Sequence, residues 1–249
     1  YFGLGAYGAA LLVKWLAVPM GFALVAAPIV ALAGALLFGW FAVRLSGVYL
    51  AMLTLAFAQI VWALVFQWET LTGGSNGVIG IWPPKPFDKS WVYFLLTLTL
   101  TTIAILLLRR FLFAPFGYSM RAGRDSPLRA EAIGIDVKRV HWLGFAIAGG
   151  ICGIAGGLFA FAKGSISPET IHVGRSIDGL VMVLLGGIQT LTGPIVGASV
   201  FATLQDTVMR QTEYWRALLG IIILILVLAF PQGIVGAFSA MWRRAGAKP

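Results

Sequence analysis

The amino-acid sequence predicts an all-α fold, a polytopic bundle of transmembrane helices. Only 27 of its 249 residues are charged, about 11%, whereas roughly 25% of the residues of a soluble domain are charged. Hydrophobic residues make up 59% of the chain, and the mean hydropathy is +0.92. The charged residues also cluster, so that seven stretches contain no Asp, Glu, Lys or Arg. Such a chain cannot cover a water-exposed surface with charge, and its solvent is therefore lipid.

Six of the charge-free stretches reach the 18 residues that a helix needs to cross a bilayer, and five of these six have the length of a single span. They are 22–43, 48–66, 91–108, 141–162 and 217–242. The first charge-free stretch, 1–13, is too short to cross, and it opens at Tyr1 in the middle of an apolar run. We therefore expect an N-terminally truncated bundle whose preceding helices are missing from this sequence.

The remaining stretch, 179–205, is predicted to form a broken, re-entrant helix pair. Its 27 residues are too many for one simple span, and a single helix would hold Pro194 in its interior at a cost of about 3 kcal/mol or more. Gly186-Gly187 and Gly193-Pro194 divide it into two helices, each about half as long as the bilayer is thick. A re-entrant pair leaves 11 basic and 3 acidic residues inside and 7 basic and 6 acidic residues outside. A single span would give a weaker positive-inside bias.

The distribution of Lys and Arg predicts which loops face the cytoplasm. Loop 109–140 is the most basic, and basic loops stay on the cytoplasmic side. Alternation then puts Arg44 inside and loops 14–21, 67–90 and 163–178 outside. Basic loops beside an anionic leaflet account for the net charge of +9, so we expect the lipid bilayer as a partner and no nucleic acid.

The residue inventory argues against catalysis and against a bound metal or cofactor. Cys152 is the single cysteine, and with two histidines it is too little for a zinc cluster or a Cys-His nucleophile pair. The motifs G-x-x-x-x-G-K-[ST] and H-E-x-x-H are absent from the sequence. We therefore expect a noncatalytic membrane protein, and a membrane-embedded enzyme with an unrecognised site is the alternative that these absences disfavour.

Within the predicted cytoplasmic loop, the sequence around Pro127 predicts a short capped helix. Asp125 or Ser126 can cap its start, Pro127 suits its first turn, and Gly134 can supply a left-handed end. A short helix with basic side chains at a membrane exit suits docking to a cytoplasmic partner. The alternative is an ordinary solvated loop.

The same segment, Arg129–Lys138 (RAEAIGIDVK), resembles the coupling-loop ("EAA") region of ABC importer permeases, in the version of the branched-chain amino acid permeases. Three further motifs resemble that family in the same order, so that the resemblance covers nearly the whole chain. They are 1–7 (YFGLGAY), 71–77 (LTGGSNG), and Gly186-Gly187 followed by 193–198 (GPIVGA). The T-G-G-S-N-G loop resembles the LivM-type subunit more than its LivH-type partner.

The resemblance implies one ABC-importer permease domain over 1–249, with a coupling loop at 114–140. It implies a subunit of the bacterial inner membrane that forms half of the pathway for branched-chain amino acids. The implied partners are a LivH-like second permease subunit, two cytoplasmic ATP-binding subunits, and a periplasmic or lipid-anchored substrate-binding protein. The residues implied for ATPase coupling are Arg124, Asp125, Arg129, Ala130, Glu131, Ala132 and Gly134. Glu131 can pair with Arg124 or Arg129 or accept a backbone amide, and the sequence leaves this open.

The expected translocation path combines uncharged polar side chains with free backbone groups at interrupted helices. The candidates are Thr54, Gln59, Gly73, Gly74, Asn76, Gly186 and Gly187. For Thr54 and Gln59 the alternative is a hydrogen bond to a neighbouring helix, and for loop 67–90 it is a plain connector. The glycines of 149–157 are predicted to permit close helix packing. Two other functions remain open, a related urea or short-amide ABC importer and an autonomous channel or facilitator.

Overall fold

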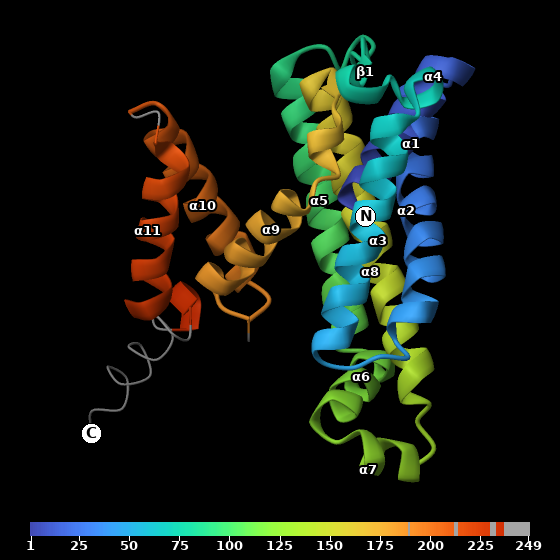
Figure 1. The fold of residues 1–249 in the computed structure, drawn as a ribbon, viewed down its shortest axis with the longest axis vertical. Coiled ribbons are helices and arrows are strands. Elements are labelled where there is room, and N and C mark those ends of the chain that lie inside the picture. Colours follow the sequence, from blue (N-terminus) through green and yellow to red (C-terminus); the bar gives the residue numbers. More distant parts are fainter. Residues whose placement is uncertain (189, 212–213, 230–232, 237–249) are drawn as a thin grey trace. The chain divides into compact units, whose positions relative to one another are not determined.

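The computed structural model describes residues 1–188, 190–211, 214–229 and 233–236, and it is almost entirely helical (Figure 1). The chain divides into two compact units, 1–173 and 174–249, which are described separately below. The helices of the first unit are α1 (Phe2–Leu16), α2 (Met20–Ala42), α3 (Val48–Gln67), α4 (Glu69–Thr72), α5 (Ser90–Leu112), α6 (Pro115–Asp125), α7 (Pro127–Ala132) and α8 (Val137–Lys163). Two single-turn 3-10 helices, η1 (Gly74–Asn76) and η2 (Pro168–Thr170), and two short strands, β1 (Val78–Ile79) and β2 (Ser165–Ile166), lie in its loops.

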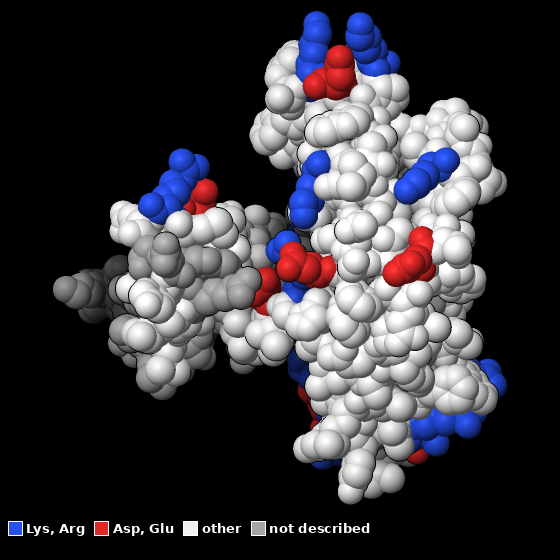
Figure 2. All heavy atoms as spheres, turned by 45° about the horizontal axis from the view of Figure 1, so that its top comes forward, with Lys and Arg blue, Asp and Glu red and all other residues white. Residues whose placement is uncertain are grey.

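Four helices of the described chain, α2, α3, α5 and α8, are long and apolar enough to cross a membrane. They coincide with the stretches predicted as spans between residues 22 and 162, which confirms a helical membrane bundle. Figure 2 shows the charged side chains gathered in groups, with wide uncharged surface between them. Within α3 no residue is buried, as suits a helix whose apolar side chains face lipid or another membrane subunit.

The core of the first unit is a three-helix contact of α8 with α1 and α2, and small side chains bring the helices together. The alanines at every fourth position of α2 are completely buried, namely Ala23, Ala27, Ala31 and Ala35. Residues four apart lie on one face of a helix, and this face meets the predicted glycine ladder of α8. A Cβ added to Gly149 or Gly153 would lie 2.4 Å from the Cβ of Ala35 or Ala31, respectively. The prediction that these glycines permit close packing is confirmed.

Contact between α1 and α8 is closer still, because backbone meets backbone. A Cβ added to Gly156 would lie 1.9 Å from the carbonyl oxygen of Phe2, and one added to Gly5 would lie 2.4 Å from that of Gly153. In lipid the apolar side chains gain little from leaving their solvent, so helices associate through such close van der Waals contact. The short first stretch, 1–13, is therefore a helix of the core.

The loops that alternation assigns to one side of the membrane meet at one end of the first unit. The Nε1 of Trp15 donates to the carbonyl of Leu71 over 3.0 Å, which joins loops 14–21 and 67–90. Antiparallel pairing of β1 with β2, in the register Val78 with Ile166, joins 67–90 to 163–178. At the opposite end, the Nε1 of Trp142 donates to the carbonyl of Leu36 over 2.8 Å, near α6 and α7. The grouping of loops is the one that the positive-inside analysis requires.

The second unit contains α10 (Gly193–Met209), α11 (Trp215–Ala229) and most of α9 (Val173–Gly186). The predicted break in 179–205 is present, since α9 ends at Gly186 and α10 begins at Gly193. A Cβ added to Gly197 would lie 1.9 Å from the carbonyl oxygen of Met182, so the two helices touch through their backbones. Whether they re-enter the membrane stays a prediction. The end of the predicted span 217–242 lies outside the described residues.

We expect Gly156→Ala to destabilise the first unit, because its new methyl group would displace the carbonyl of Phe2 in α1. Overpacking of this kind costs about 1–3 kcal/mol. Thermal unfolding of the detergent-solubilised protein, followed by size-exclusion chromatography of heated samples, would show a lower midpoint. Gly21→Ala is the matched control, since a Cβ there meets nothing within 4 Å. Equal midpoints for the two variants would contradict the proposed backbone contact.

Candidate functional site

The segment between the long helices α5 and α8 is folded into two helices, α6 and α7, at one end of the first unit (Figure 1). Sequence analysis predicted only the second of them within a loop, so α6 is an addition that the structure makes. Pro115 occupies the first turn of α6, where its missing N–H is not needed. The signal for α6 was the four-residue spacing of Phe116 and Met120, which both approach Gly144 of α8.

Helix α6 packs closely against α8. A Cβ added to Gly144 would lie 2.6 Å from the Cε of Met120, and one added to Gly123 would lie 3.0 Å from the Cγ1 of Val137. Both glycines therefore leave room for a side chain of the facing helix. As a result α6 lies against the first half of α8.

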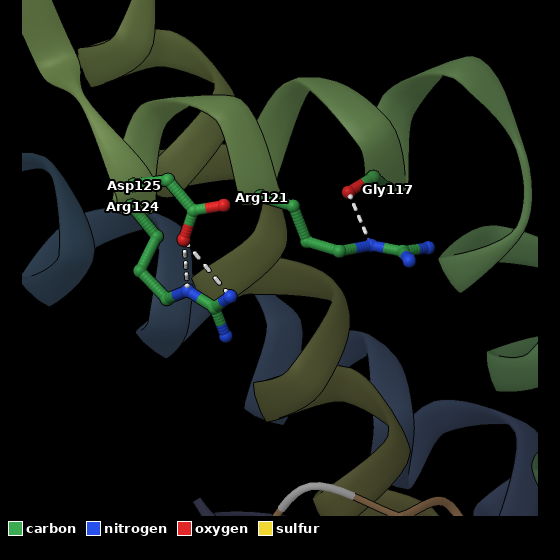
Figure 3. A network of polar contacts seen from close by, with 4 residues as sticks. All are labelled: Gly117, Arg121, Arg124 and Asp125. Carbon is green, nitrogen blue, oxygen red and sulfur yellow. Dashed lines mark hydrogen bonds and ion pairs between the residues drawn. The ribbon is translucent and has the colours of Figure 1, made fainter.

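Arg121 links α6 to the end of α5, and its contact with Gly117 within α6 is drawn in Figure 3. Its Nη2 donates to the carbonyl of Leu112, the last residue of α5, and its Nε lies 3.4 Å from the carbonyl oxygen of Gly117. The guanidinium also lies 4.7 Å from the ring centroid of Tyr118. The last carbonyls of a helix lack partners within it, so a cation there satisfies hydrogen bonding and opposes the helix dipole. Sequence analysis did not single out Arg121.

The ion pairs of the coupling segment differ from the alternatives left open by the sequence. Arg124 pairs with its neighbour Asp125, with 2.9 Å between Nη2 and Oδ1, and both side chains are largely exposed (Figure 3). An exposed pair of this kind adds little stability. In the part of the chain that the structure describes, neither Glu131 nor Arg129 has a side-chain hydrogen bond or ion pair. Both remain available to another protein.

The predicted short helix is present as α7, with Pro127 at its first turn; Ser126 stands at the N-cap position, but neither its side chain nor that of Asp125 makes the predicted capping hydrogen bond. Its end is a Schellman motif, in which the N–H of Ile135 donates to the carbonyl of Ala130 and the N–H of Gly134 to that of Glu131. Gly134 has φ of +87°, a conformation that side-chain-bearing residues seldom adopt. The predicted left-handed end is therefore present, and it fixes where the chain turns toward α8.

The two faces of α7 differ in their exposure to solvent. Ala130 is 2% exposed and packs inward, whereas Leu128 is 81% exposed and Ile133, directly after the helix, is 75% exposed. Arg129 and Glu131 are also exposed. α7 lies beyond the end of α5, so these exposed apolar side chains do not belong to a membrane-spanning helix (Figure 1). Large exposed apolar side chains between charged ones, on a helix whose opposite face is packed against the protein, are typical of a surface that binds another protein.

Thr54 and Gln59, two candidates for the translocation path, lie on α3. The Oγ1 of Thr54 donates to the carbonyl of Ala51 over 2.9 Å, which is a bond within its own helix and not to a neighbour. Gln59 is exposed, and among the described residues its side chain has no hydrogen-bond partner. A role of Gln59 in a path would therefore need a surface supplied by another subunit, and it stays a prediction.

Three other path candidates, Gly73, Gly74 and Asn76, form the turn after α4. A Cβ added to Gly73 would lie 2.0 Å from the carbonyl oxygen of Gly77, so this glycine is needed to close the turn. The preceding Thr72 is 4% exposed, and its Oγ1 lies 2.6 Å from the carbonyl oxygen of Val65 and 2.7 Å from that of Trp68, which share its one donated proton. The structure thus gives the glycines a local structural role, and Thr72 is the buried anchor that the sequence analysis missed.

Gly186 and Gly187 lie buried in the second unit, where three backbone segments meet. A Cβ added to Gly186 would lie 1.8 Å from the carbonyl oxygen of Gly193, and one added to Gly233 would lie 2.3 Å from the Cα of Gly187. The glycines hold α9, α10 and the segment after α11 together. Their predicted part in the translocation path is untested. Within the described ranges, no three His, Cys, Asp or Glu side chains are grouped closely enough to hold a metal ion.

Comparison with known proteins gives matches along nearly the whole chain. The family model described as "Branched-chain amino acid transport system / permease component" matches residues 1–228, across both units. The high-affinity branched-chain amino acid transport system permease protein LivM of Escherichia coli (strain K12) is 27% identical over 94% of this chain and 62% of its own length. The autoinducer 2 import system permease protein LsrC of Salmonella paratyphi B is 30% identical over 57% of this chain and 44% of its own length.

A probable LivH permease of Methanocaldococcus jannaschii is 25% identical over 49% of this chain and 41% of its own length. No solved structure matches. The chain spans about three fifths of the length of its LivM relatives. With a family model matched over 1–228 and a bundle of apolar helices, this multi-pass membrane protein belongs to the branched-chain amino acid transport system permease component family.

Proposed function

We propose that this chain is a transmembrane subunit of an ABC importer for branched-chain amino acids, and that separate ATPase subunits drive it through α7. The observation that carries the proposal is the exposed apolar surface of Leu128 and Ile133 on a helix anchored by buried Ala130. The LivM and LivH relatives are named as branched-chain amino acid permeases, which supports branched-chain amino acids as the cargo. The proposed location is the bacterial inner membrane, with α7 in the cytoplasm.

The proposed partners follow from what the chain lacks and what it exposes. Since the sequence has no P-loop, two cytoplasmic ATP-binding subunits would supply the energy. A LivH-like second permease would complete the pathway, on surfaces such as that of α3, where no residue is buried. A periplasmic or lipid-anchored binding protein would deliver the amino acid. All of 1–249 would then act as one permease domain, with 114–140 as the coupling loop.

A force applied to α7 would be transmitted through its connection to α8 to the membrane-spanning helices. Four residues, 133–136, link α7 to α8 and include the Schellman turn at Gly134, and α6 packs against both α7 and the first half of α8. In turn α8 is in close backbone contact with α1 and packs on α2. Closure of the ATPase subunits would therefore tilt the three-helix core as a body, as an import cycle with two states requires.

Reconstitution of the complete complex in proteoliposomes tests this function. We expect uptake of leucine only with ATP, the ATPase subunits and the binding protein present, because the chain has no energy source of its own. Uptake of urea under the same conditions would instead support the related amide importers. Leucine uptake that is equal with and without the ATPase subunits would identify an autonomous facilitator and contradict the proposal.

We expect Gly134→Pro to abolish ATP-driven uptake and to leave membrane insertion intact. Proline cannot adopt φ of +87° and removes the N–H that bonds to the carbonyl of Glu131, so the end of α7 would unravel. Gly134→Asn is the matched control, since asparagine tolerates the left-handed conformation and keeps the N–H. Uptake at the parental rate in the proline variant, at equal amounts of complex, would refute the role of this turn.

We expect Leu128→Ser combined with Ile133→Ser to weaken binding of the ATPase subunit at least about tenfold, because each buried apolar side chain contributes about 1.5–3 kcal/mol. Glu131→Ala is expected to weaken it as well, since Glu131 has no ion pair within the described chain. Affinity for the purified ATPase can be measured by biolayer interferometry on nanodiscs. Ile79→Ser, an exposed residue of β1 at the other end of the unit, is the control. Equal affinity for all variants would place the ATPase elsewhere.

A further inference from the structure

A pocket of about 270 Å3 lies at the end of the first unit that carries α6 and α7. None of the individual residues proposed for ATPase coupling or for the translocation path lines it. The end of α2 and the segment after it form one wall, and the first turns of α8 with the residue before them form the other. The lining residues are Trp40, Val43, Arg44, Asp136, Lys138, Arg139 and Trp142.

The pocket is strongly basic, with three cations and one carboxylate. That carboxylate is already engaged, because Asp136 pairs with the Nε of Arg139 over 2.9 Å and accepts the backbone N–H of the same residue over 3.1 Å. Arg44 lies over the ring of Trp40, with 3.7 Å from its Cζ to the ring centroid. Among the described residues neither Arg44 nor Lys138 has a carboxylate partner. The start of α8 adds the positive end of a long helix dipole, so the pocket favours an anion.

The surroundings of the pocket fit a ligand that carries apolar chains. Trp40 is 44% exposed, and its neighbours Phe41, Leu37 and Leu45 are also exposed on the same helix end. Trp142 is held in place by its hydrogen bond to Leu36. Tryptophan side chains at helix ends lie at the level of the lipid headgroups. A basic pocket between two membrane helices, directly beside exposed apolar surface at headgroup level, is typical of a binding site for an anionic phospholipid.

We propose that this pocket binds the headgroup of an anionic phospholipid. Arg44 and Lys138 contact its phosphate, Trp40 lies beside its glycerol region, and its acyl chains follow the exposed apolar side of α2. The bound lipid joins the end of α2 to the short linker between Gly134 and α8, so it steadies the connection through which α7 acts on the core. The proposal concerns the membrane itself and holds for any transported cargo.

Native mass spectrometry of the delipidated complex, titrated with dioleoyl phosphatidylglycerol or dioleoyl phosphatidylcholine, tests the proposal. We expect one phosphatidylglycerol to bind the parental complex in preference to phosphatidylcholine. We expect R44Q combined with K138Q to weaken its binding about fivefold or more, because each removed cation loses its attraction to the anion. The control is R109Q combined with R110Q, which removes the same charge from exposed positions at the end of α5, outside the pocket. The charge-conserving R44K combined with K138R should keep the preference and shows that the pocket residues can be replaced without unfolding.

Three results would overturn the proposal. An equal loss in the two charge-removing variants would show attraction to the general surface charge. Displacement of the lipid by 10 mM inorganic phosphate, chosen as about a ten-thousandfold excess over a micromolar lipid site, would show a site for free anions. Binding to the isolated membrane subunit but not to the assembled complex would show that a protein partner covers the pocket.

Discussion

The contact of α8 with α1 and α2 is the constraint on which the rest of the structure depends. Small residues alone permit it, because Gly156 meets the backbone of α1 and Gly153 meets the alanine face of α2. In lipid, where burial of apolar side chains gains little, such contact supplies much of the energy that holds helices together. The same three helices determine where the loops gather, which helix end carries α6 and α7, and where the basic pocket opens.

The helical core supports α6 and α7 and so keeps the short helix α7 in place. A helix as short as α7 is not stable alone, and it is held here by buried Ala130, by the turn at Gly134 and by α6. Arg121 adds a link from α6 to the last carbonyl of α5. These supports leave the outward face of α7 free for a partner while its inward face stays joined to α8. In the proposed function, docking and transmission would therefore use separate faces of one helix.

Local signals predicted a large part of this structure. The spans followed from charge-free length, the break from Gly186 and Pro194, and α7 from Pro127 and Gly134. The helix α6 was missed because its charged residues suggested a loop, whereas its packing depends on the distant Gly144. The alanine face of α2 was hidden because alanine does not stand out within a uniformly apolar helix. The pocket joins Arg44 to Lys138, and only the folded chain brings such distant residues together.

The central claim is that a nucleotide-driven protein holds α7 on the cytoplasmic side. Site-directed crosslinking tests it most directly, with Leu128→Cys in a Cys152→Ser background and a short bifunctional thiol reagent. We expect a crosslink to the ATPase subunit in inverted membrane vesicles, with a yield that changes when ATP binds, and labelling by membrane-impermeant maleimide from the cytoplasmic face alone. Labelling from the periplasmic face, or no crosslink to any ATP-binding subunit in the intact complex, would contradict the account.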